Sequence, residues 1–332
     1  MAQILLVGLG AGAAAGLLFA SVASGSILSM LLFWIAPLPI LIAALGWSHW
    51  AGLVAALCGS LGLAIAFRYS FAVTFLVWAG LPGWILGYLA LLARPSDSAP
   101  GGAEWYPPGR LVVWAALFGS LLMIAAIPVY GLDEESFRSG LRQDFQRMLR
   151  VASPTPPGDP ATAPGSGPSD VNRLINILVV IMPVLVAVIG TLTNIINLWL
   201  AARIVKFSGR LPRPWPDFTA MTFPNTVPVV LALAITGAVL PRLIGTPSLV
   251  GTVASVIAAS LLIAYGAMGF AVLHAITAGR PNRGYILAGA YAAVGIFGWP
   301  LLALTLLGLA DGIFDIRGRV ASKRGPPSQP QT

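Results

Sequence analysis

The stretch from Leu174 to Ala201 constrains the fold of this chain most, because none of its 28 residues is ionisable. A helix rises about 1.5 Å per residue, so a helix of this length exceeds the ~30 Å hydrocarbon core of a bilayer. We therefore predict that the stretch spans a membrane. Its length and Pro183 in its first half predict a tilted or kinked helix.

Small and polar side chains line one face of the second half of this span. Their 4-3-4 spacing places them on a single helix face. The stripe consists of Gly190, Asn194, Asn197 and Ala201, with Thr191 and Thr193 beside it. One interpretation is that the amides join neighbouring helices by hydrogen bonds. The alternative is a pocket for a small polar molecule, lined by Asn194, Asn197, Thr191 and Thr193.

The composition excludes water as the main solvent of this chain. Of its 332 residues, 57% are hydrophobic and 9% are charged, and the mean hydropathy is +0.86. Soluble domains carry roughly 25% charged residues. The net charge of +8 comes from basic residues beside apolar runs, as in membrane proteins, so we take the lipid bilayer as partner and expect no nucleic acid.

Changes in composition divide the chain into five segments. Residues 1–132 hold five apolar spans, and residues 133–152 predict an amphipathic surface helix. Residues 153–170 are rich in Pro, Gly and Ser and predict a disordered linker. Residues 171–318 hold the remaining spans, and residues 319–332 form a basic tail that we expect to be disordered. The fold class is therefore all-α, a bundle of eight or nine transmembrane helices.

Two of the N-terminal spans are interrupted near their middle. Pro37 and Pro39 break the second span, and Gly80–Gly83 interrupts the fourth. The segments 32–42 and 76–86 share a tryptophan, a small residue, Leu-Pro and an aliphatic run, which suggests a weak internal repeat. Interrupted helices of this kind often form substrate sites in transporters.

The first span carries Gly8, Gly12 and Gly16, spaced four residues apart on one face. Such GxxxG repeats let a second helix approach closely. The partner is either another helix of this chain or a second membrane protein. We therefore count the three glycines as candidate partner-docking residues.

The orientation follows from the basic loop after the long span. Positive loops stay in the cytoplasm, so we place residues 203–225 there and residues 133–173 on the outer, periplasmic or extracellular, side. With nine spans the basic tail would be exported, against the same rule. A re-entrant hairpin bent at Trp299-Pro300 would return the tail to the cytoplasm, whereas a plain ninth span would not.

The residue types of known membrane chemistry are missing from the sequence. No apolar span contains a charged residue well inside it, which disfavours coupled ion transport and aspartyl proteolysis. Gly-x-Ser-x-Gly, HExxH and phosphate-loop motifs are also missing, and Cys58 is the only cysteine. We therefore expect no enzyme activity, no cofactor and no metal.

An acidic pair follows the last apolar run. Asp311 and Asp315 are four residues apart on one helix face, and Arg317 or Arg319 can pair with them. We expect a surface ion pair that anchors the chain end, and the alternative is a contact with a partner subunit or lipid headgroups. Asp311, Asp315 and Arg317 join the candidate docking residues.

The end of the chain resembles the YybS-like family of bacterial multi-pass membrane proteins. The resemblance covers roughly 174–319 and rests on an aromatic-x-x-Gly-aromatic span before a basic turn and on a terminal motif. The motif residues are Gly308, Leu309, Asp311, Phe314, Asp315 and Arg317. It implies a bacterial inner-membrane protein. It also implies a fold similar to the substrate-binding subunits of energy-coupling-factor transporters.

Two functional hypotheses follow. The first is a membrane component that binds or transports a small polar molecule without its own energy source. The second is an envelope scaffold that docks other membrane protein subunits through its glycine face and charged ends. Replacing both asparagines by leucine distinguishes the two.

Overall fold

A computed structural model describes residues 1–97, 102–152, 168–246 and 248–324. Most of the predicted linker and the last eight residues of the tail lie outside this part. The predicted boundaries shift at two places. Residues 168–170 belong to a long helix, and residues 319–324 are helical because the Gly318 amide donates a hydrogen bond to Asp315 Oδ1 (3.1 Å), which caps the last helix.

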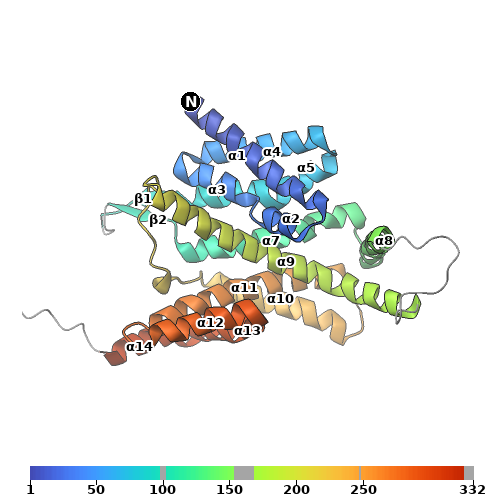
Figure 1. Ribbon diagram of the computed structural model, residues 1–332. Coiled ribbons are helices and arrows are strands. Elements are labelled where there is room, and N and C mark those ends of the chain that lie inside the picture. Colours follow the sequence, from blue (N-terminus) through green and yellow to red (C-terminus); the bar gives the residue numbers. More distant parts are fainter. Residues whose placement is uncertain (98–101, 153–167, 247, 325–332) are drawn as a thin grey trace, which may run out of the picture.

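Helices dominate the described residues, and a short antiparallel strand pair accompanies them (Figure 1). The elements are α1 Ala2–Ala20, η1 Ser21–Ser24, α2 Ile27–Trp34, α3 Pro37–Gly46, α4 His49–Ala66, α5 Tyr69–Phe75, η2 Leu76–Gly80, α6 Leu81–Ala90, β1 Ala93–Pro95, β2 Ala103–Trp105, α7 Pro108–Tyr130, α8 Glu134–Ala152, α9 Pro168–Phe207, η3 Phe218–Ala220, α10 Thr226–Leu243, α11 Leu249–Ile276, α12 Arg283–Phe297, α13 Pro300–Phe314 and α14 Ile316–Arg324.

Eight helical segments of the described chain are long and apolar enough to cross a membrane. They coincide with the spans expected from the sequence, so the prediction of an all-α polytopic bundle is confirmed. Many large apolar side chains are exposed along them, including Ile27, Leu61 and Leu233. This exposure is expected where lipid replaces water as the solvent.

Helices α7 and α9 form the centre of the bundle. In Figure 1 the N-terminal helices α1 to α6 lie on one side of them and α10 to α14 on the other. Helix α9 packs against α7, α3 and α11, and α7 also packs against α11. Because α9 has 40 residues, it is about 60 Å long, and it crosses the bundle obliquely.

The glycine face of α1 packs against α4. A Cβ atom at Gly8 would lie 2.7 Å from Val54 Cβ, and one at Gly12 would lie 2.5 Å from the Ala55 carbonyl oxygen. Gly16 faces Gly59. A helix of the same chain therefore occupies this face, the first of the two arrangements considered for it.

Both interrupted spans break where the sequence indicated. The second span divides into α2 and α3 at Ile35–Ala36, and the fourth passes through the π-helical turn η2 before Pro82. The two segments after the breaks, α3 and α6, pack together, with Gly83 against Ile40 and Gly87 against Ala44. Their glycines permit the close approach.

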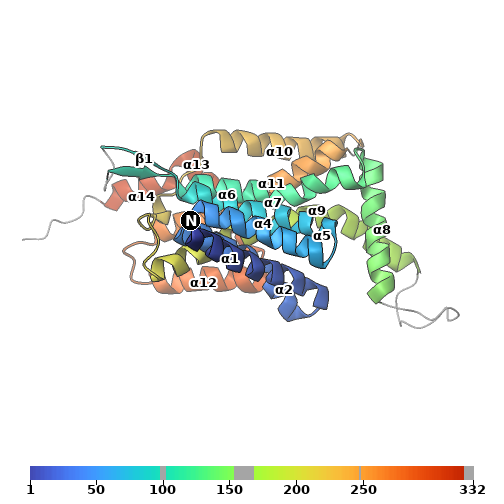
Figure 2. The ribbon, with the colours of Figure 1, turned by 90° about the horizontal axis from the view of Figure 1, so that it is seen from above.

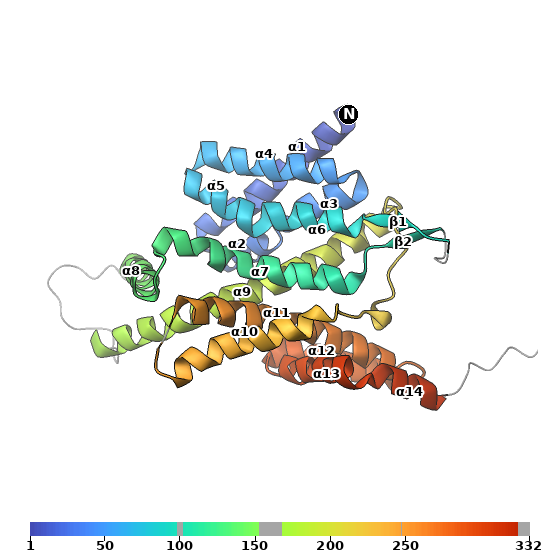
Figure 3. The ribbon, with the colours of Figure 1, turned by 180° about the vertical axis from the view of Figure 1, so that it is seen from behind.

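Helices α12 and α13 form a hairpin. Each has 15 residues, about 22 Å, and Gly298 joins them with a positive φ of 71°. Helix α13 packs against α11, and α14 returns to the end of the bundle that carries the β pair (Figure 3). This geometry corresponds to the hairpin alternative and not to a single ninth span.

The amphipathic helix α8 lies across the opposite end of the bundle. Figure 2 shows it running crosswise to the neighbouring helices. Phe137 and Leu141 are its buried residues in one core cluster, where they meet Ile175 and Val179 of α9. Its polar face stays exposed, as the spacing of its apolar residues predicts.

Candidate functional site

The side chain of Asn197 connects α9 to the broken second span. Its Nδ2 donates hydrogen bonds to the carbonyl oxygens of Trp34 and Thr193, both at 2.8 Å. Trp34 is the last residue of α2. In a continuous helix its carbonyl oxygen would accept a hydrogen bond from the Leu38 amide, but this amide donates to the Ile35 carbonyl oxygen instead. The break thus frees the Trp34 carbonyl, and Asn197 satisfies it inside the bundle.

Asn194 and Thr191 lie at the crossing of α7 and α9. Asn194 Nδ2 donates to the Ala115 carbonyl oxygen of α7 at 3.3 Å, and Thr191 Oγ1 donates to Ala187 within its own helix at 2.8 Å. Gly190 meets Gly119 of α7, where a Cβ at Gly190 would lie 3.1 Å from Gly119 Cα. The polar stripe therefore packs against other helices at each of these points.

The four candidate pocket residues are buried: Thr191, Thr193, Asn194 and Asn197. They line neither of the two small cavities between α8, α9 and α11. One polar atom of the group lacks a hydrogen-bond partner, Oδ1 of Asn197, and Nε1 of Trp78 is another buried atom without one. A ligand role for these residues stays a prediction.

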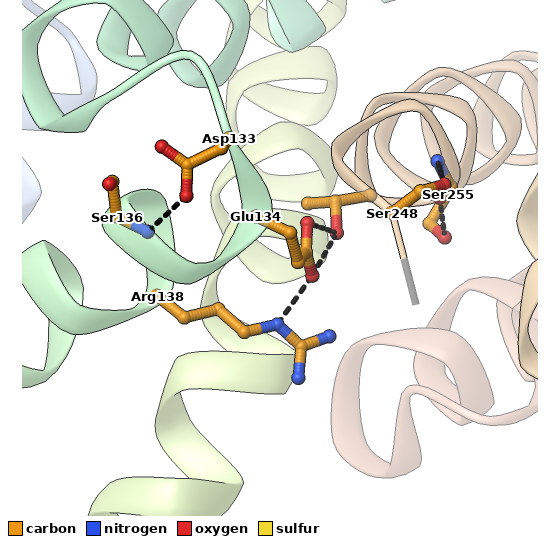
Figure 4. A network of polar contacts seen from close by, with 8 residues as sticks. Asp133, Glu134, Ser136, Arg138, Ser248 and Ser255 are labelled. Atoms are coloured by element: carbon orange, nitrogen blue, oxygen red, sulfur yellow. Dashed lines mark hydrogen bonds and ion pairs between the residues drawn. The ribbon is translucent and has the colours of Figure 1, made fainter. Parts of the chain in front are cut away.

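A second polar group joins α8 to α11 (Figure 4). The Glu134 carboxylate accepts hydrogen bonds from Thr252 Oγ1 at 3.2 Å and from Arg138 Nε. The Asp133 carboxylate accepts a bond from the Ser136 amide at 2.8 Å and so caps α8. Hydrogen bonds from Ser136 hold the pKa of the Asp133 carboxyl below its ordinary value.

Two voids lie beneath α8, where it meets α9 and α11. Each has a volume of about 10 Å³, the space of one water molecule. Phe137, Pro183 and Thr252 line both, and Arg138 and Arg242 line the second. The second void therefore has charged side chains in its lining, whereas the first is lined mainly by apolar ones, and no pattern in the sequence pointed to either.

The acidic residues near the chain end do not form the expected surface ion pair. Asp311 Oδ2 lies 2.7 Å from Arg317 Nη2, and the two side chains are only 3% and 15% exposed. Arg317 Nη1 also donates to the carbonyl oxygens of Thr219 and Met221, at 2.7 and 2.9 Å. The expectation is wrong because the loop before α10 folds over the pair and buries it.

Helix α12 has an open face that the sequence did not single out. None of its residues is buried. A Cβ atom added at Gly284, Gly289 or Gly295 would have no atom of this chain within 4 Å. Helical spacing puts four small residues on one face: Gly284, Ala288, Ala292 and Gly295. This small-xxx-small pattern is the sequence signal that could have revealed the open face.

Within the described residues, no group of three His, Cys, Asp or Glu side chains could hold a metal ion. Cys58 is a free thiol whose Sγ lies 3.7 Å from the Leu9 carbonyl oxygen. His274 Nε2 lies 3.0 Å from the Tyr291 hydroxyl, a contact between α11 and α12. These groups make contacts between helices and converge on no common point.

A comparison with protein families matches residues 13–312 to the family described as "Predicted membrane protein (DUF2232)". No curated protein and no solved structure matches the chain. The matched region extends beyond 174–319 into the N-terminal spans. The YybS-like resemblance stays a prediction, and no solved structure supports the similarity of fold to energy-coupling-factor subunits.

Proposed function

Because the chain belongs to the DUF2232 family of predicted membrane proteins, we propose that it is a membrane-embedded subunit that assembles with another membrane protein. The proposal selects the scaffold hypothesis over the transport hypothesis. We place the protein in a bacterial inner membrane, with the 203–225 loop in the cytoplasm, on the distribution of basic residues.

The open face of α12 carries this proposal. A glycine inside a helix costs about 1 kcal/mol relative to alanine, so three of them weaken α12 by roughly 3 kcal/mol. In a membrane, glycine offsets this cost when another backbone packs closely against it. Gly8, Gly12 and Gly16 of α1 have such a neighbour in α4, whereas the glycines of α12 have none in this chain. A helix from a second protein would supply it.

Photo-crosslinking in native membranes tests the proposal. A photo-reactive residue at Ala288 should form a crosslink with one defined protein, and mass spectrometry would show whether that is another membrane protein or a second copy. The same probe at Leu240, an exposed residue of α10, should capture lipid alone. Both probes lie on exposed positions of apolar helices, but only Ala288 lies on the face of small residues.

Bulky substitutions make the test specific. Gly284→Leu with Gly295→Leu fills the open face and should abolish the protein crosslink. Gly10→Leu with Gly62→Leu is the matched control, since these glycines also have open space around them but lie on α1 and α4. A crosslink at Ala288 that survives the first pair, or that contains lipid only, would overturn the proposal.

Binding of a small polar molecule is the second candidate function. It is favoured by Asn197 Oδ1, a buried acceptor without a partner at the break of the second span. Asn197→Leu would then abolish solute binding while leaving the Ala288 crosslink intact. The opposite result, loss of the crosslink with solute binding retained, would assign the asparagine to assembly.

A further inference from the structure

Three cations and three tryptophans gather around the carboxyl end of α9. We call this group the basic–aromatic cluster: Arg203, Lys206, Arg210, Trp47, Trp199 and Trp215. Lys206 Nζ lies 4.8 Å and Arg203 Cζ 5.3 Å from the centre of the Trp215 ring. Arg210 Cζ lies 4.5 Å from the centre of the Trp47 ring. The rings hold the cations in place through cation–π attraction.

The cations of the cluster lack acidic partners. The salt bridges of the described residues join Arg94 to Glu104, Arg138 to Glu134, Arg147 to Asp144 and Arg317 to Asp311. None includes Arg203, Lys206 or Arg210, which are exposed. The carboxyl end of α9 contributes about half a negative charge, too little to balance three positive ones. An anion from outside the chain would complete the group.

The loop that carries Arg210 and Trp215 of the cluster is tied to the bundle by Arg213. Arg213 Nη1 donates to the Ala90 carbonyl oxygen at 3.0 Å, and its Nη2 donates to that of Tyr106 at 3.3 Å. These bonds fix the loop against the end of α6 and the residue after β2. Arg213 is therefore committed to structure, whereas the cations of the cluster are available to a ligand.

The position of the cluster selects the kind of anion. It lies at the end of the bundle that carries the β pair and α14 (Figure 3). Tryptophan side chains are enriched at the headgroup level of membranes, and three of them belong to the cluster. Several Lys and Arg residues directly beside a transmembrane helix attract anionic headgroups. Guanidinium groups bind phosphate oxygens through two parallel hydrogen bonds.

We propose that the basic–aromatic cluster binds a phosphate group, that of an anionic phospholipid headgroup. Arg203, Lys206 and Arg210 contact the phosphate oxygens, while Trp199 and Trp215 flank the headgroup at the membrane surface. The site is separate from α12 and does not depend on the proposed assembly.

Native mass spectrometry of the full chain in neutral detergent tests the site. Phosphatidylglycerol and phosphatidylcholine are added separately, and the fraction of protein that retains each lipid is measured. One basic residue near a surface contributes about fivefold to the affinity, so R203Q/K206Q/R210Q should weaken phosphatidylglycerol binding roughly 100-fold. R203K/R210K keeps the charges but loses the paired guanidinium hydrogen bonds, so its affinity should fall between those of the unmodified chain and the triple variant.

The control is R280Q/R283Q/R319Q, which removes as many charges from the same end of the bundle but leaves the tryptophan-lined group intact. It should change the affinity less than fivefold. An equal loss in both triple variants would overturn the site in favour of general surface charge, as would equal retention of the two lipids by the unmodified chain. Displacement of the lipid by millimolar inorganic phosphate would identify free phosphate as the ligand.

Discussion

The amide of Asn197 bonds two carbonyl oxygens from different spans at 2.8 Å each. One belongs to Trp34, which the broken second span leaves without its helical partner. An unsatisfied carbonyl in hydrocarbon costs several kcal/mol, so the amide replaces a bond that the proline-containing segment cannot make. Asn194 makes a longer bond, 3.3 Å, to a carbonyl of the uninterrupted helix α7. The two asparagines therefore differ in what their loss would expose.

Asn197→Leu should destabilise the protein more than Asn194→Leu. We expect about 1–2 kcal/mol for Asn197, the upper part of the range measured for hydrogen bonds between membrane helices, and about 0.6 kcal/mol for Asn194. Unfolding in mixed micelles with increasing dodecyl sulfate would measure both values. An equal or reversed order would show that the Trp34 carbonyl finds another partner.

At the same scale, the sequence predicted both asparagines as buried polar groups but left their partners open. The Trp34 oxygen lies 163 residues away in the chain, and only the folded arrangement brings it beside α9. Gly8, Gly12 and Gly16 were recognisable as a packing face, yet spacing alone could not distinguish α4 from a second protein. Local patterns identify which faces need partners, whereas the partner depends on tertiary packing.

At the scale of elements, the crossing of α7 and α9 depends on the smallest side chains. Gly119 and Gly190 meet there, and a Cβ at Gly119 would lie 2.5 Å from the backbone nitrogen of Thr191 and closer still to its Oγ1. Because the obstacle is largely backbone, a rotamer change cannot relieve it. The two central helices would have to separate.

Gly119→Ala should therefore destabilise the bundle by about 1–3 kcal/mol, the usual cost of overpacking. Gly62→Ala is the matched control, because a Cβ there would meet no atom of this chain within 4 Å. The control should be neutral or stabilising by up to ~1 kcal/mol, since alanine favours the helix. Thermal unfolding in detergent would measure both, and equal effects would contradict the close crossing.

The attachment of α13 and α14 depends on the buried pair of Asp311 and Arg317. Asp311→Ala leaves the Arg317 charge buried without its carboxylate, which typically costs about 3–5 kcal/mol. Asp315→Asn removes a charge four residues later but keeps the oxygen that caps α14, so its cost should stay below about 0.5 kcal/mol. Limited proteolysis after Arg317 and thermal unfolding would compare the two variants. Equal stability of both variants would show that the ion pair of Asp311 and Arg317 does not stabilise the fold.

At the scale of the whole molecule, charge distinguishes the two ends of the bundle. Of the 19 Lys and Arg residues, 12 belong to the end with the β pair. One lies in β1, one at the start of α7, four between 203 and 213, two at 280–283 and four between 317 and 324. Seven lie at the α8 end. The sequence alone could not assign the last four cations to either end. A hairpin places them at the end with the β pair, whereas a ninth span would place them at the α8 end.

The hairpin makes a definite prediction about sidedness. Arg317 bonds Thr219 and Met221, so we expect α14 and the 203–225 loop on the same side of the membrane. Cys58 is first replaced by alanine, and single cysteines are then introduced at Ser139, Ser208 and Ser322, all exposed. In intact cells a membrane-impermeant maleimide should label Ser139→Cys, whereas Ser208→Cys and Ser322→Cys should react only after the membrane is opened. Labelling of Ser322→Cys together with Ser139→Cys in intact cells would mean that the chain crosses the bilayer a ninth time. The buried contact between Arg317 and the loop could not then exist, because no side chain reaches across ~30 Å of hydrocarbon.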